Sequence, residues 1–137
     1  MTFFLALWMA FADIGTLKAE PDLDRRSELA LANADHDVDA ARKAYSGGDD
    51  KAVEAALEEL QQSVDVSYDA LGLTHKAPRN SKYYKSAELK VRALIRRLNS
   101  FRDEVSFETR QRVETVIKRL SDVHDELLNG IMSKKKK

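Results

Sequence analysis

The feature that most constrains the fold is an apolar stripe between Tyr84 and Val105. Its members follow one another at steps of 3, 4, 3, 4, 3 and 4: Tyr84, Ala87, Val91, Leu94, Leu98, Phe101 and Val105. Residues three and four apart share one face of an α-helix, so this spacing predicts a helix with a single apolar side. The positions between them are mostly cationic: Lys85, Lys90, Arg92, Arg96, Arg97 and Arg102. Such a helix needs partners that cover its apolar side, and the rest of the chain supplies candidates.

Length and composition favour one all-α domain. A chain of 137 residues corresponds to a single domain and can bury a sizeable core. The absence of Cys excludes disulfides, thiolate zinc sites, iron–sulfur ligation and c-type haem attachment. With only two Pro and five Gly, and no strand-length alternation of β-branched residues, the sequence predicts helices throughout.

Three further helices are predicted, over residues 22 to 45 or 46, 50 to 71, and 107 to about 129. Glycines or an Asn-Gly pair mark their ends: Gly47-Gly48, Gly72 and Asn129-Gly130. Each helix carries its own stripe: Leu23, Ala30, Ala34, Val38, Ala41 and Tyr45; then Val53, Leu57, Leu60, Val64 and Leu71; then Val113, Val116, Leu120, Val123, Leu127 and Ile131. Short turns between long helices force antiparallel hairpins. We therefore expect an antiparallel four-helix bundle built from two helical hairpins, over residues 20–132. The alanine-rich first stripe leaves monomer and homodimer both open.

The formal net charge of zero conceals two oppositely charged segments. Residues 20–75 carry 14 acidic and 5 basic side chains, whereas residues 76–102 carry 9 basic ones and a single acid, Glu88. The favoured interpretation is internal: acids of the helix over 50–71 face cations of the helix over 84–105 along the rim of the bundle. The alternative is that the basic helix meets an external anionic partner.

The first 19 residues have the pattern of a secretory signal peptide. Residues 3–12 form an apolar run that is too short to span a bilayer, and small residues allow cleavage after Ala12 or after Ala19. No Lys or Arg precedes the run, which leaves a second interpretation: an N-terminal helix that docks on the bundle. We expect a periplasmic or secreted protein without a transmembrane span, with a cytoplasmic location as the alternative. Residues 133–137 are expected to form a disordered basic tail.

The connection over residues 73–81, LTHKAPRNS, and the start of the next helix combine cations with aromatic rings. Four of these residues are the candidate binding residues: Lys76, Arg79, Lys82 and Tyr83. Such side chains suit phosphate, carboxylate or glycan groups. The alternative is structural, with a tyrosine that seals the end of the core and cations that solvate the loop.

The sequence argues against an enzyme. Neither a nucleophile–base pattern, a glycine-rich phosphate loop nor zinc-ligand spacing occurs. None of the apolar stripes includes an acid, as paired carboxylates in a buried active site would require. The three histidines lack ligand spacing, and His124, beside the last stripe, is expected to be a boundary residue with a satisfied hydrogen bond. We predict no catalytic residue, no metal site and no cofactor.

Three segments resemble one family: HKAPRNSKYYKSAE, KVRALIRRLNSFRDEVS and VHDELLNGIM. The resemblance is to small exported bacterial α-helical proteins of unknown function, over roughly residues 40–132. It implies export and a helical fold, and it implies no activity. Together these features predict a non-catalytic exported bundle that binds a protein or an envelope component. The alternative is a cytoplasmic regulatory or scaffold bundle that binds an anionic partner through its basic third helix; the near-neutral charge balance and the acidic first hairpin argue against nucleic acid.

Overall fold

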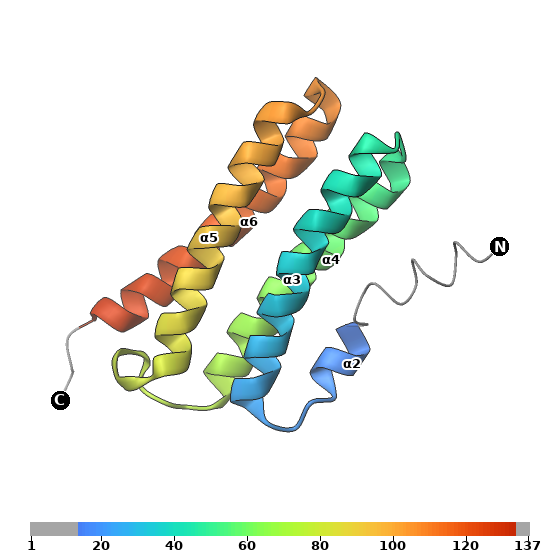
Figure 1. Cartoon of the computed structure of the whole chain (residues 1–137). Helices are drawn as coiled ribbons and strands as arrows, with labels where there is room; N and C mark the ends of the chain where they lie inside the picture. Colours follow the sequence, from blue (N-terminus) through green and yellow to red (C-terminus); the bar gives the residue numbers. More distant parts are fainter. Residues whose placement is uncertain (1–13, 134–137) are drawn as a thin grey trace.

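The computed structural model describes residues 14–133, and this part of the chain is all-helical (Figure 1). The helices are α2 (Ile14–Lys18), α3 (Leu23–Ser46), α4 (Asp50–Leu73), α5 (Lys82–Glu104) and α6 (Phe107–Met132), with the short 3-10 turn η1 (Pro78–Asn80) between α4 and α5. The described range contains no β-strand, which confirms the predicted all-α class. No helix within this range has both the length and the apolar character needed to cross a bilayer.

The four long helices form two hairpins that lie side by side (Figure 1). Helix α3 packs on α4, and α5 packs on α6. Between the hairpins α3 meets α5 and α4 meets α6, whereas α5 has little contact with α4. Helix α5 therefore occupies an outer corner, and the face opposite its partners is free of the other described helices.

The apolar stripes form most of the core as predicted, although Leu23 is half-buried and belongs to neither hydrophobic cluster. All seven residues of the stripe between Tyr84 and Val105 are buried, and so are the five stripe residues of α4. One hydrophobic cluster contains side chains from α3, α4, α5 and α6, with Phe101, Leu60 and Leu98 among its largest fully buried members. Burial of these stripes is the main favourable term in folding.

Helix starts follow the capping residues, but two helix ends differ from the prediction. Asp22 and Ser81 cap α3 and α5, because each side-chain oxygen accepts hydrogen bonds from backbone N–H groups of the first turn. The prediction that Gly72 ends its helix is wrong, since α4 continues to Leu73. The stop at Asn129-Gly130 is wrong as well: α6 runs to Met132, and Gly130 lies against the ring of Pro78.

Helix α2 packs on the bundle, although the favoured interpretation placed everything before Glu20 outside it. Leu17 is only 3% exposed and forms a small cluster with Ala30 of α3 and Val66 of α4. Residues 1–13, which hold the apolar run of the predicted signal peptide, lie outside the described residues, as do the tail residues 134–137. Removal of the segment up to Ala12 or Ala19 stays a prediction.

The rim charges pair differently from the prediction. The guanidinium of Arg97 on α5 bonds to Asp35 (2.5 Å) and to Asp39, both on α3 rather than α4. Burial lowers the pKa of Arg97, but the hydrogen bonds that its guanidinium donates to these two carboxylates outweigh burial and raise the pKa above its ordinary value. The acid of α4 that does cross the rim, Asp65, pairs with Arg119 of α6 at 2.9 Å. The expected contact between acids of α4 and cations of α5 is wrong because those two helices lie diagonally opposite.

Candidate functional site

Lys76 connects the loop between the two hairpins to the start of α3 through an ion pair. Its Nζ lies 2.6 Å from Oδ2 of Asp24, in the first turn of α3. This hydrogen bond raises the pKa of Lys76. One of the four predicted binding residues therefore has a structural contact within the chain.

Tyr83 lies between two cations. The Nζ atoms of Lys76 and Lys82 are 5.5 and 5.2 Å from the centre of its ring, within the range of cation–π contacts. Tyr83 is half-buried against the core, so it also seals this end of the bundle. The structure thus brings Lys76, Lys82 and Tyr83 together. Arg79 is exposed on η1, and no described residue joins it to the other three by a hydrogen bond, ion pair or ring contact.

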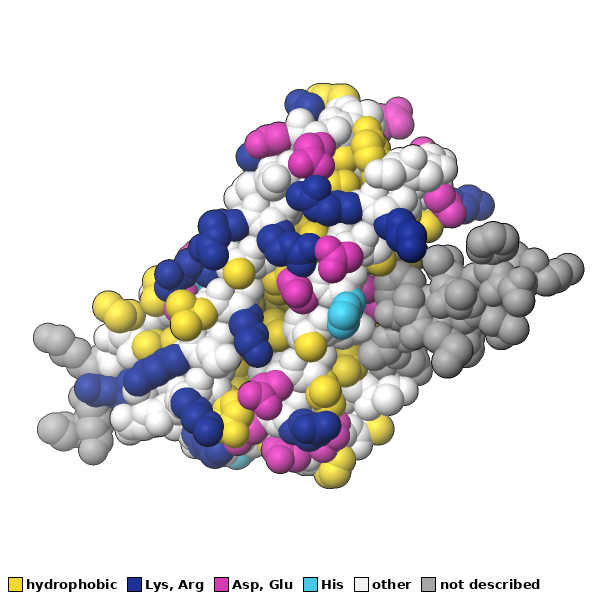
Figure 2. Space-filling view, viewed as in Figure 1, with side chains coloured by type: hydrophobic (Ala, Val, Ile, Leu, Met, Phe, Trp, Pro, Cys, Tyr) yellow, Lys and Arg dark blue, Asp and Glu magenta, His cyan; other side chains and the backbone are white. Residues whose placement is uncertain are grey.

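The outward side of α5 continues from this loop as a row of cations, which we call the basic face. It consists of Arg79, Lys82, Lys85, Leu89, Arg92 and Arg96. From Lys82 onward these residues step by 3, 4, 3 and 4, as the core stripe does, but on the opposite side of the helix. All are exposed, and the first exposed carboxylate along α5 is Asp103. Figure 2 shows a band of Lys and Arg side chains crossing this side of the molecule.

Beneath the basic face lies a buried carboxylate that the sequence analysis missed. Glu88 is 5% exposed, and its Oε2 accepts hydrogen bonds from Arg92 (Nη2 at 2.5 Å, Nε at 2.9 Å) and is 2.7 Å from Nε2 of His124 on α6. Burial raises the pKa of Glu88, but the hydrogen bonds from Arg92 and His124 outweigh burial and hold the pKa below its usual value. The prediction of a satisfied boundary histidine at His124 is confirmed. The cluster joins α5 to α6, and among the described residues no hydroxyl nucleophile bonds to His124.

A second buried acid lies between α3 and α4. Asp37 is 0% exposed, and neither carboxylate oxygen has a hydrogen-bond partner among the described residues. Burial, followed by the nearby Glu59 carboxyl group, raises the pKa of Asp37 from 3.8 to about 9. Asn33 donates to Glu59 (3.0 Å) and to Ser63 (2.9 Å) in the same interface. The expectation that no acid takes a core-facing position is therefore wrong for both Asp37 and Glu88.

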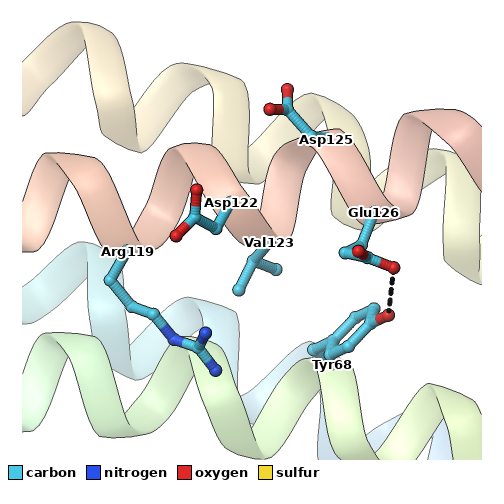
Figure 3. A pocket seen from close by; sticks show the side chains of 6 residues that line it. All are labelled: Tyr68, Arg119, Asp122, Val123, Asp125 and Glu126. Carbon is cyan, nitrogen blue, oxygen red and sulfur yellow. Dashed lines mark hydrogen bonds between the residues drawn. The ribbon is translucent and has the colours of Figure 1, made fainter.

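The groove between α4 and α6 contains an open hollow of about 360 Å³. Tyr68 donates a hydrogen bond to Glu126 (3.4 Å) at one end, and Arg119 reaches towards α4 at the other, while Asp125 points away (Figure 3). Burial and then the charge of Glu126 raise the pKa of Tyr68. Tyr68 and Glu126 bond to each other, while Arg119 and Asp122 pair with Asp65 and Lys118 outside the hollow, so the lining offers no convergent set of groups for a ligand. Nowhere in residues 14–133 do three His, Asp or Glu side chains gather in a way that could hold a metal ion.

Comparison with models of protein families, with curated proteins and with solved structures finds no match for this chain. On the described surface, the basic face groups five exposed cations without an exposed carboxylate among them.

Proposed function

We propose that this protein is a non-catalytic helical bundle that binds an anionic partner through the basic face of η1 and α5. One observation carries the proposal: four exposed cations and one leucine follow a single side of α5, continuing from Arg79 on η1, without an exposed carboxylate before Asp103. Two of the four predicted binding residues, Arg79 and Lys82, form the first part of this face. Lys76 and Tyr83 support it by fixing the loop.

The basic side chains that bridge two elements differ from those of the basic face. Several basic side chains between elements have an acid partner: Arg42 with Glu104, Arg97 with Asp35 and Asp39, and Arg119 with Asp65. Lys82, Lys85 and Arg96, by contrast, form no ion pair with any described carboxylate. Like charges three or four residues apart destabilise a helix by about 0.2–0.5 kcal/mol per pair. An anionic partner would relieve this repulsion.

We propose further that the two hairpins act as one antiparallel four-helix bundle, monomeric or homodimeric. The shared hydrophobic cluster of α3, α4, α5 and α6 supports a single unit. A bundle of this kind would present α5 as a rigid platform, because the core side of the helix is fixed by packing.

Export remains part of the proposal. The apolar run over residues 3–12, the small residues before both candidate cleavage positions, and the resemblance to small exported helical proteins support a periplasmic or secreted protein. The anionic partner would then be a protein or an envelope component. The alternative is a cytoplasmic scaffold that uses the same face.

The test compares two charge-reversed proteins with equal net charge. Lys85→Glu/Arg96→Glu alters the basic face, whereas Lys43→Glu/Lys51→Glu alters exposed lysines of α3 and α4. Binding to fluorescent polyphosphate is measured by anisotropy at low salt. We expect the first variant to lose roughly tenfold or more in affinity, because binding to a polyanion depends on the cations in contact with it. The control variant should bind like the wild type. Equal losses in both variants, or no binding by the wild type, would contradict the proposal.

A further inference from the structure

We infer that the basic face rests on an anionic lipid bilayer, an inference that depends on the proposed function and specifies its partner. Helix α5 lies at an outer corner, with α3 on one flank and α6 on the other. The residues of the basic face form one row along its outward side, and a plane can contact such a row along its whole length. A protein groove or a flexible polymer would gain more from a helix whose flanks were also open.

Leu89 supplies an exposed apolar side chain within the basic face. It is 56% exposed and stands at the centre of the basic face, four residues after Lys85 and three before Arg92. A single exposed leucine is ordinary on a protein surface. In this row, however, it is surrounded by long cationic side chains, whose stems can lie along an apolar layer while their charges reach the headgroups. Cations around an apolar residue are the arrangement of a helix that lies in the membrane interface.

A second exposed apolar side chain lies at the start of the basic face. Gly130 of α6 lies against Pro78 of η1, where an added Cβ would be 3.1 Å from Cγ of the proline. This contact places the end of α6, with Met132 at 72% exposure, beside η1, where the basic face begins.

The experiment is co-sedimentation of the full-length protein with vesicles of phosphatidylglycerol mixed with phosphatidylcholine, and with phosphatidylcholine alone. We expect binding to the anionic vesicles only, weakened by salt. Lys85→Glu/Arg96→Glu should lower the partition coefficient roughly 100-fold or more. Each Lys or Arg near an anionic membrane surface adds to the free energy of binding, and the variant loses two such cations and gains two anions. Lys43→Glu/Lys51→Glu should bind like the wild type.

A matched apolar pair tests the role of Leu89. Leu89→Ser should weaken vesicle binding severalfold, whereas Phe107→Ser, which alters a side chain 68% exposed at the start of α6, should leave it unchanged. Circular dichroism melting of each variant controls for folding.

The outcomes separate the two proposals. Binding to polyphosphate without binding to anionic vesicles would overturn the lipid inference and leave the proposed function standing. Binding to neither would overturn both. Equal vesicle binding by all the variants would show that another surface makes the contact.

Discussion

Nε2 of His124 on α6 lies 2.7 Å from Oε2 of Glu88 on α5, so a buried carboxylate joins the two helices of the second hairpin. The same oxygen accepts two hydrogen bonds from Arg92, a member of the basic face. Glu88 therefore links the interior of the hairpin to the surface that we assign to binding. It fixes one cation of that surface while leaving the guanidinium half-exposed.

Glu88→Gln should lower the free energy of unfolding at pH 7 by about 1–2 kcal/mol, because the charged hydrogen bonds to Arg92 and His124 become weaker. The folded protein holds the pKa of Glu88 below its ordinary 4.5, so the stabilisation is complete above that value and is lost as the pH falls through the lowered pKa. Urea denaturation between pH 7 and pH 3 should show the wild type and the variant converging in acid.

Asp125→Asn is the matched control, since Asp125 is exposed on the same helix as His124. This substitution should change stability by less than about 0.5 kcal/mol. A constant difference between wild type and Glu88→Gln at every pH would contradict the role given to the Glu88 charge.

Asp37→Asn should stabilise the protein at neutral and alkaline pH. The pKa of Asp37 is about 9 in the folded protein and near 3.8 without its surroundings, so between these values the folded state holds a proton that the unfolded state releases. Stability therefore falls as the pH rises through this window. Asparagine cannot ionise, and the variant should gain about 1 kcal/mol or more at pH 8.

The measurement is urea denaturation at pH 5 and pH 8, with the exposed Glu54→Gln on α4 as the control. The advantage of Asp37→Asn should grow with pH. An advantage that shrinks with pH would show that Asp37 is ionised in the folded protein.

Helical periodicity predicted the core well, because residues three and four apart share a helix face whatever the neighbouring helices do. The placement of the second hairpin depends on packing between helices, which no local pattern encodes. Arg97 pairs with Asp35 and Asp39 of α3. The sequence around Arg97 does not distinguish α3 from α4 as its partner helix. The predicted helix end at Gly130 is wrong for a similar reason. Pro78 packs on Gly130 from a loop distant in sequence, and α6 continues to Met132.

Gly72 and Gly130 make a matched pair that tests this explanation. Both lie inside helices, but a Cβ added to Gly72 meets nothing within 4 Å, whereas one at Gly130 would be 3.1 Å from Pro78. Gly72→Ala should raise the free energy of unfolding by about 0.5–1 kcal/mol. Gly130→Ala should raise the free energy of unfolding by less than Gly72→Ala does, or should lower it, since the ring of Pro78 must shift. Thermal denaturation distinguishes the two, and equal gains would contradict the close contact.

The two candidate cleavage positions predict proteins of different stability. A chain that begins at Asp13 keeps α2 and its buried Leu17, whereas one that begins at Glu20 exposes Ala30 and Val66. We expect the longer form to be more stable by about 1–2 kcal/mol in urea denaturation. Leu17→Ala in the longer form should remove most of this difference. Equal stability of the two forms would show that α2 adds little to the bundle.

The candidate site was only partly predictable. The sequence identifies Lys82 and Arg79 as candidate binding residues because they are cations near tyrosines. For the cations that follow, such as Lys85 and Arg96, the favoured interpretation was pairing with the acids of α4. Glu88 carried an available signal: it is the one acid of a basic segment and lies four residues after Tyr84, beside the core stripe. Its partner His124 is 36 residues away on another helix, so only the folded structure reveals the pair.

An NMR titration of the ¹⁵N-labelled protein with polyphosphate, monitored through amide chemical shifts, locates the binding surface residue by residue. We predict shifts concentrated on η1 and on the outward residues of α5 from Lys82 to Arg96, with the groove between α4 and α6 unchanged. Shifts centred on that groove, or spread evenly over the molecule, would contradict the assignment of binding to the basic face.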